Sequence, residues 1–428
     1  MLAMLIAIFV VAYAAIALEH PIRVNKGASA LLAAGLLWIV YAVMGGDHRQ
    51  VDLDLAESLA ATAQVVFFLM GAMTIVEVVD AHDGFEVISS RIRTSRQPAL
   101  MWLIGGVTFF LSAVFDNLTT AIVMISLTRK LIADDEDRLF FAGMIVIAAN
   151  AGGAWSPIGD VTTTMLWIGG QITPLSIIEA VFIPAAISLI VPLVVTSYTL
   201  RGKVIAPPAA ARRRTGSTAS DFEKRLMLWL GVACLVSVPA FKTVTHLPPF
   251  LGILFGLGIL WLVGEVVHRG KEEEHRRHLT LVNALKNIDM SSVVFFIGIL
   301  LSVAVLEHTH ILAALAGWLD QTIGRLDVIV IIIGLVSAVV DNVPLVAATI
   351  GMYSLEQYPT DHFLWEFVAY CAGTGGSILI IGSAAGVAAM GLEKIQFLWY
   401  ARRIGGLALI GYLAGALAYI VQYRLQHG

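Results

Sequence analysis

Long apolar runs dominate the chain, and the charged residues gather in the short segments between them. Runs that suit a helical membrane crossing cover residues 2–18, 27–44, 56–79, 139–168, 175–200, 226–241, 250–267, 288–306, 363–392 and 404–423. In lipid only helices and closed barrels pair all backbone polar groups, and these runs are too long for barrel strands. We therefore expect an all-α polytopic membrane protein with about ten full crossings.

Two further apolar stretches, 99–128 and 326–353, each carry an Asp-Asn pair near the middle, Asp116-Asn117 and Asp341-Asn342. Such a pair is unfavourable in a lipid-facing helix but is tolerated at the tip of a re-entrant hairpin. With both stretches as hairpins, 23 of the 27 Lys and Arg residues fall in loops on one side. The positive-inside rule places that side in the cytoplasm and predicts that both termini are periplasmic.

The second half of the chain repeats the landmarks of the first half in the same order. SAVFDN at 112–117 recurs as SAVVDN at 337–342, and ANAGG at 149–153 is matched by AGTGG at 372–376. Because the predicted topology reverses their direction, we expect two inverted-topology repeats with a site near the bilayer midplane. The expected units are N-terminal transmembrane helices at 1–55, a first repeat at 56–200 with hairpin 99–128 and broken helix 139–168, a cytoplasmic linker at 201–225, and a second repeat at 226–428 with hairpin 326–353 and broken helix 363–392.

Polar side chains are concentrated at the two hairpin tips and the two glycine-rich breaks. They supply carboxylate, amide and hydroxyl oxygens, and these four segments contain no Lys or Arg. Oxygen donors without a fixed cation suit Na⁺ or Li⁺, although helix N-termini at the breaks could also hold an anion. A carboxylate that binds either Na⁺ or a proton is sufficient for exchange. The candidate cation- and proton-binding residues are Ser112, Asp116, Asn117, Asn150, Asp160, Thr162, Thr163, Ser337, Asp341, Asn342, Thr374, Ser377 and Ser383.

Within this set we expect Na⁺ at Asp116, Asn117, Asn150, Asp160 and Asn342. Three more acids lie where predicted spans meet the cytoplasmic edge. Glu77 and Asp80 end one span and Asp289 begins another, so they are candidates for a proton path.

At these residues the chain resembles the NhaD-type sodium/proton antiporters of the ion transporter superfamily. The most specific parts are SAVFDNLTTA from residue 112, NAGGAWSPIGDVTTTMLW from residue 150 and SAVVDNVP from residue 337. The resemblance implies exchange of Na⁺ or Li⁺ for H⁺ by alternating access, no cofactor, and a place in the lipid bilayer of a bacterial inner membrane. Analogy with the superfamily also implies a homodimer.

Other function classes account for parts of the pattern. A Na⁺-coupled dicarboxylate carrier of the same superfamily would share the fold, but Asp116 and Asp341 stand where such carriers typically have a neutral serine. An intramembrane aspartyl protease could use Asp116 and Asp160 as a dyad, but that leaves the second repeat unexplained. Two opposed hairpins favour alternating access over a passive channel. The net charge of −4 gives no indication of nucleic acid as a partner, so we expect a transporter and not an enzyme.

Overall fold

The computed structural model describes residues 1–45, 47–89, 94, 96–200, 220–269 and 279–427. All the regular elements in these ranges are helical, and eight of the helices are long and apolar enough to cross a membrane. The expected all-helical membrane protein is thereby confirmed. The helices are α1 (Leu2–Ala17), α2 (Glu19–Ile22), α3 (Lys26–Met44), α4 (His48–Ala81), α5 (Glu86–Ser89), α6 (Gln97–Phe115), α7 (Asn117–Leu131), α8 (Asp135–Ala154), α9 (Val161–Ile168), α10 (Pro174–Thr199), α11 (Asp221–Thr245), α12 (Pro249–Val267), α14 (Leu281–Asn287), α15 (Met290–His308), α16 (Ile311–Ile323), α17 (Leu326–Val336), α18 (Asn342–Met352), α19 (Phe363–Gly375), α20 (Ala384–Glu393), α21 (Phe397–Tyr400), the π-helix η1 (Ala401–Gly405) and α22 (Gly406–His427).

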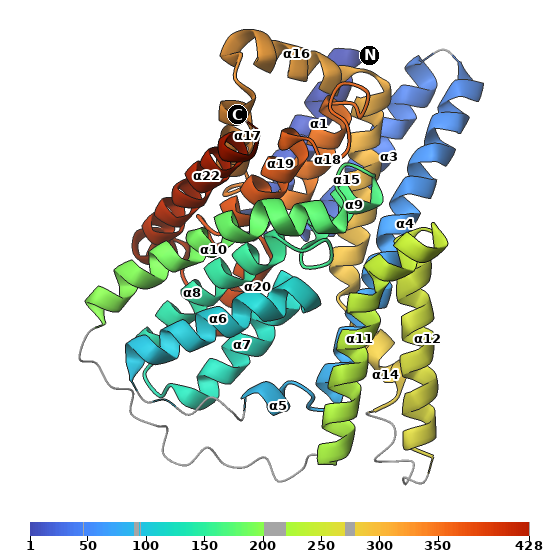
Figure 1. The fold of residues 1–428 in the computed structure, drawn as a ribbon. Coiled ribbons are helices and arrows are strands. Elements are labelled where there is room, and N and C mark those ends of the chain that lie inside the picture. Colours follow the sequence, from blue (N-terminus) through green and yellow to red (C-terminus); the bar gives the residue numbers. More distant parts are fainter. Residues whose placement is uncertain (46, 90–93, 95, 201–219, 270–278, 428) are drawn as a thin grey trace.

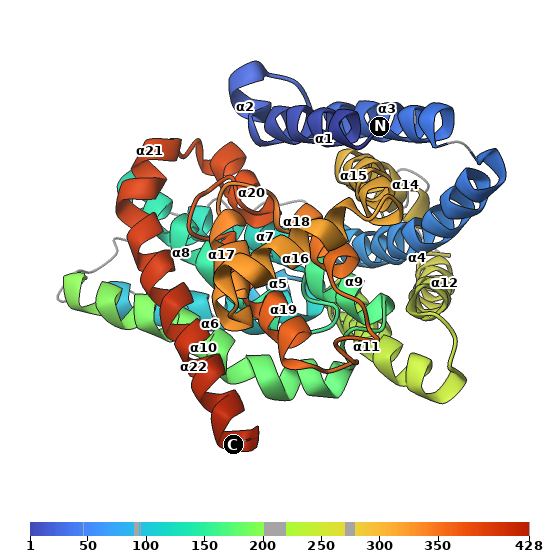
Figure 2. The ribbon, with the colours of Figure 1, turned by 90° about the horizontal axis from the view of Figure 1, so that it is seen from above.

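The helices form two neighbouring groups (Figures 1 and 2). The upright helices α4, α11, α12 and α15 stand on one side, and α3 packs along α15, where Trp38 Nε1 donates to Leu301 O at 3.0 Å. On the other side the interrupted helices α6 to α9 and α17 to α20 gather next to α10 and α22, which cross each other (Figure 2). The second half of α8 and nearly all of α19 are buried, so the interrupted helices supply much of the interior.

Each predicted hairpin and each predicted broken helix divides into two helices. The pairs are α6 with α7, α8 with α9, α17 with α18, and α19 with α20. At every break, one side chain accepts a hydrogen bond from a backbone N–H of the helix that follows, as an N-cap does. The four caps are Asp116 for α7, Asp160 for α9, Asp341 for α18 and Ser383 for α20.

Two glycines allow the broken helices to pack directly on the hairpins. A Cβ atom on Gly152 of α8 would lie 2.1 Å from Phe109 O of α6. In the second half, a Cβ atom on Gly375 of α19 would lie 2.0 Å from Gly334 O of α17. The internal repeat seen in the sequence is thus also present in the packing. The inverted relation between the two halves stays a prediction.

The helix boundaries differ from the predicted units in two places. The boundary after residue 55 falls inside α4, which continues unbroken to Ala81. The boundary after residue 225 falls inside α11, where Ser220 and Glu223 form a capping box that starts the helix earlier. Helix α16 lies outside every predicted span and buries Leu312 and Ala316. Most of the predicted linker, residues 201–219, lies outside the described residues.

Candidate functional site

The N-terminal ends of four half-helices meet in the interior of the protein. Asn117 begins α7 and Asn342 begins α18, while Asp160 and Ser383 cap α9 and α20. All four side chains are at most 5% exposed. Because buried polar groups need hydrogen-bond partners, the bonds between these side chains define the site.

Asp160 is the centre of this site. Its Oδ1 atom accepts from the backbone N–H of Thr162 at 2.9 Å and from the Thr162 hydroxyl at 2.8 Å. Its Oδ2 atom accepts from Asn117 Nδ2 at 2.6 Å and from Asn342 Nδ2 at 3.4 Å. Hydrogen bonds to a carboxylate are strongest when it is ionised. Because both asparagines donate to Oδ2, this one oxygen atom links the tips of the two hairpins.

Asn150 extends the network from the first broken helix to the second. Its Oδ1 atom accepts from Asn117 Nδ2 at 3.0 Å. Its Nδ2 atom donates to Ser377 Oγ at 2.9 Å and to Ser383 Oγ at 2.8 Å. The Asn150 side chain is completely buried, so its amide can be satisfied only by these protein groups or by a bound ion or water.

Four of the predicted hydroxyl groups donate to backbone carbonyls. Ser112 and Ser337 occupy equivalent positions and tie each hairpin to the broken helix that packs on it. These four side chains thus hold the frame of the site, and their oxygen lone pairs remain as acceptors. The four bonds are Ser112 Oγ to Ala149 O (2.6 Å), Ser337 Oγ to Ala372 O (2.9 Å), Thr163 Oγ1 to Asp160 O (2.9 Å) and Thr374 Oγ1 to Tyr370 O (2.6 Å).

Asp116 lies at the first hairpin tip, next to Asn117 of the network. Its φ of 69° and ψ of 157° are a combination that is almost restricted to glycine and costs about 1–3 kcal/mol. Both carboxylate oxygens accept from Thr119, Oδ1 from the backbone N–H and Oδ2 from the hydroxyl, each at 2.9 Å. The side chain is only partly buried, so this carboxylate is held in place without being closed off.

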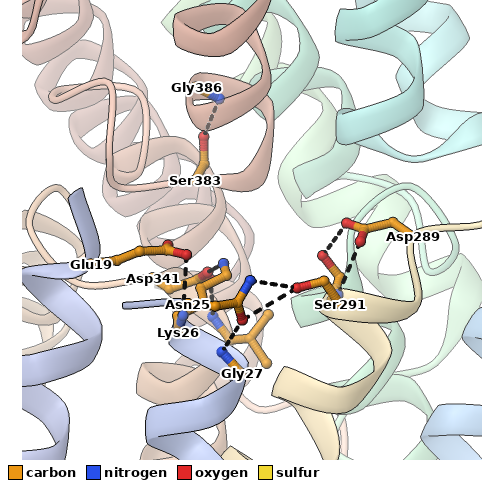
Figure 3. Close-up of polar contacts among 11 residues, drawn as sticks. Glu19, Asn25, Lys26, Gly27, Asp289, Ser291, Asp341, Ser383 and Gly386 are labelled. Carbon is orange, nitrogen blue, oxygen red and sulfur yellow. Dashed lines mark hydrogen bonds and ion pairs between the residues drawn. The ribbon is translucent and has the colours of Figure 1, made fainter. Parts of the chain in front are cut away.

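Asp341, at the second tip, lies in a different electrostatic environment. Lys26 Nζ, from the first residue of α3, is 2.7 Å from Asp341 Oδ2 (Figure 3). The hairpin tips themselves contain no basic residue, and this pair was not predicted because the two residues are 315 positions apart. Periodicity and local motifs carry no signal for a contact at that separation.

The three acids at the predicted cytoplasmic edge lie at helix ends. Glu77 is partly buried near the end of α4, and Asp80 is exposed one turn further on. Asp289 is exposed and caps α15, accepting from the backbone N–H of Ser292 at 3.2 Å. Capping is a sufficient structural reason for Asp289. A proton path through these residues stays a prediction.

Known proteins similar to this chain are transporters. The family model described as "Citrate transporter" (CitMHS) matches residues 3–365. The chain is 48% identical, over 98% of its length, to Sodium/proton antiporter 1 of Arabidopsis thaliana, 72% of which it covers. It is 29% identical, over 97% of its length, to the Na(+)/H(+) antiporter NhaD of Alkalimonas amylolytica, 89% of which it covers.

The fold is also similar to a solved transporter structure. The YdaH transporter of Alcanivorax borkumensis matches with a TM-score of 0.61 over 94% of this chain and 99% of that chain, at 13% sequence identity. At that identity the likeness concerns the fold alone. All these relatives carry the names of transporters or antiporters, which agrees with the expectation of a transporter over a protease.

Proposed function

We propose that this chain, which belongs to the citrate transporter family, exchanges Na⁺ or Li⁺ for H⁺ across the membrane by alternating access. The observation that carries the proposal is the buried Asp160 carboxylate, which is shared by amide groups from both hairpins. The names of the relatives, sodium/proton antiporter and NhaD, support the same activity.

The proposed cation site uses the oxygens around Asp160. Asn117 and Asn342 now turn their Nδ2 atoms toward Asp160 Oδ2. A half-turn of each amide would present Oδ1 instead, and Asn150 Oδ1 already faces Asn117. A bound Na⁺ would then be surrounded by one carboxylate and three amide oxygens, which are donors that hard cations prefer. Asp116, next to Asn117, supplies a second carboxylate at the edge of the site.

Coupling follows because Na⁺ and H⁺ compete for the same carboxylates. A buried carboxylate is unfavourable as a bare anion, so it favours binding either a proton or a metal ion. Either cargo neutralises Asp160, and the presence of one disfavours the other. In alternating access the carrier then moves Na⁺ across the membrane in one direction and H⁺ in the other.

A second candidate is transport of a citrate-like anion. The family description favours it, and the positive ends of four helix dipoles point into the site. Two of these N-termini, however, are already capped by the carboxylates of Asp116 and Asp160. An anionic substrate would meet like charge there, so we favour a cation.

The test is exchange by purified protein in liposomes that hold a pH-sensitive dye. We expect Na⁺ and Li⁺, each added as the chloride, to drive proton movement, and K⁺ and citrate to leave the dye signal at the level of empty liposomes. Proton movement with citrate and none with Na⁺ would select the second candidate. No signal with any of the four would contradict both.

We further propose that the cation reaches the site through a cavity of about 330 Å³ between α4 and α15 on one side and α9 and α18 on the other. Its lining includes Met165 and Ala347, from the two half-helices that begin at the site, together with the carboxylates of Glu57 and Glu307. Two carboxylates in the wall of a mainly apolar cavity attract cations to it.

Replacing Glu57 and Glu307 together with glutamine is therefore expected to raise the KM for Na⁺ by about two- to fivefold at low ionic strength. The effect should shrink when choline chloride screens the charges. Asp52→Asn, an exposed position of α4 that does not line the cavity, is the matched control. An equal change in KM in the control would show that general surface charge, and not this cavity, is responsible.

The location in a bacterial inner membrane, periplasmic termini, inverted repeats and a homodimer remain part of the proposal. The two marked ends of the chain lie toward the same end of the molecule in Figure 1, which supports a common side for the termini.

A further inference from the structure

The ion pair between Lys26 and Asp341 is set into the interface between α3, α15 and the second hairpin. The Nζ–Oδ2 distance is 2.7 Å, and the two side chains are 18% and 11% exposed. Lys26 Nζ also lies 4.3 Å from the centroid of the Phe295 ring in α15. An ammonium over an aromatic face is attracted to it, so Lys26 contacts a neighbour on each side.

The backbone around Lys26 is fixed by its own hydrogen bonds (Figure 3). The Lys26 backbone N–H donates to Glu19 Oε1 at 3.1 Å. Asn25 caps α3 by accepting from Gly27 N–H at 2.8 Å, and its Nδ2 atom donates to Ser291 Oγ at 2.9 Å. These bonds tie the start of α3 to α2 and α15 and so fix the place from which the Lys26 ammonium reaches Asp341.

A sequence difference between the two tips leaves the second carboxylate with an oxygen that its own hairpin does not satisfy. At the first tip Thr119 donates to both carboxylate oxygens of Asp116. The equivalent of Thr119 in the second tip is Pro344, which has neither a hydroxyl nor a backbone N–H. Asp341 Oδ1 accepts from Val343 N–H at 3.3 Å instead, and Oδ2 is left for Lys26.

The space beside the pair is small. A cavity of about 30 Å³ lies between Tyr13, Glu19, Lys26, Asp341 and residues of the second broken helix. That volume corresponds to about one water molecule. A hydrated cation has no room there while Lys26 is in place.

We propose that Lys26 is the fixed counter-ion of Asp341, a positioning residue that keeps the second hairpin electrically neutral and leaves the exchange of Na⁺ and H⁺ to Asp116 and Asp160. This inference rests on the proposed function. Asp341 then does not bind Na⁺ and H⁺ in turn, because the Lys26 ammonium neutralises it permanently.

The charge balance at this pair acts on the cation site through a short route. Asp341 is adjacent to Asn342, whose amide donates to Asp160. An unpaired Asp341 would add negative charge beside the site and tighten Na⁺ binding. An unpaired Lys26 would add positive charge and weaken Na⁺ binding. The two single variants should therefore change the KM for Na⁺ in opposite directions.

The test is a double-mutant cycle on full-length protein in liposomes, with Na⁺ concentration varied and proton movement recorded. Lys26→Met is expected to lower the KM for Na⁺ by about fivefold, and Asp341→Asn to raise it by a similar factor. In the combined variant the two effects should cancel, which brings the KM back to within about twofold of wild type. Lys26→Arg keeps the charge and should keep the wild-type KM.

A matched control is Lys224→Met. Lys224 Nζ lies 2.5 Å from Glu86 Oε2 of α5, so this variant breaks another partly buried ion pair of a lysine. Its KM for Na⁺ should not change. The inference would be overturned if the KM values of the two single variants moved in the same direction. It would also be overturned if the combined variant were inactive while Lys26→Arg was active, and Asp341 would then belong to the exchange site. Wild-type protein that shows no Na⁺-driven proton movement would instead contradict the proposed function, and the inference with it.

Discussion

Asp160→Asn is expected to reduce Na⁺-driven proton movement at least about a hundredfold, equivalent to roughly 2.7 kcal/mol. The asparagine can keep the cap on α9, because its oxygen can still accept from Thr162. Its amide nitrogen, however, would face Asn117 Nδ2, so that a donor meets a donor. It also brings neither a negative charge for Na⁺ nor a proton to release. The measurement is dye-reported exchange in liposomes at matched protein density.

The control for this variant is Asp134→Asn. Asp134 is also an N-cap, for α8, and accepts from Asp137 N–H at 2.8 Å on the protein surface. It should insert and exchange like wild type, and both variants should give similar yields. Exchange by the Asp160 variant at the rate of the Asp134 variant would place the cation site elsewhere. Loss of Na⁺-dependent thermal stabilisation in the Asp160 variant alone would link the defect to ion binding.

Gly375→Ala is expected to lower the free energy of unfolding by about 3 kcal/mol, the upper end of the usual cost of overpacking. The new Cβ atom would lie 2.0 Å from Gly334 O. The clash is with a backbone carbonyl, which cannot rotate away as a side chain can, so α19 would have to move off α17. The same reasoning applies to Gly152→Ala, which meets Phe109 O at 2.1 Å. Monodisperse yield and Tm in detergent are the measurements.

Gly106→Ala is the matched control for the packing prediction. Gly106 lies on α6, and a Cβ atom there meets nothing within 4 Å. Alanine is favoured over glycine in a helix, so this variant should be neutral or slightly stabilising. If the Tm of the Gly375 variant equalled that of the Gly106 variant, the direct backbone contact between α17 and α19 would be contradicted.

Residues close together in the chain account for most of what could be foreseen. Asp116 and Asp341 predicted interruptions in their apolar stretches, and the structure breaks a helix at each. The glycines after Asn150 and Thr374 predicted the breaks between α8 and α9 and between α19 and α20. These signals are local, because a charge or a glycine changes the backbone within a few residues of itself.

The hydrogen-bond partners of the site residues could not be predicted from the sequence. The bond from Asn117 to Asp160 spans 43 positions, and that from Asn150 to Ser383 spans 233. Both members of each pair were predicted for the site, but not that Asp160 is its centre. Helix α16 was missed because its 13 residues are fewer than a full membrane crossing requires. Asp289, predicted for a proton path, has a cap as its visible role.

The sequence by itself determined that this protein is a bundle of membrane helices with paired interruptions and buried oxygen donors, because a bilayer imposes length and polarity on each segment separately. Only the tertiary structure decided that, among the residues it describes, Asp341 and not Asp116 is paired with a lysine. That outcome depends on where α3 packs against α15. Packing between helices 315 positions apart is set by the shapes of complete surfaces, which no local pattern contains.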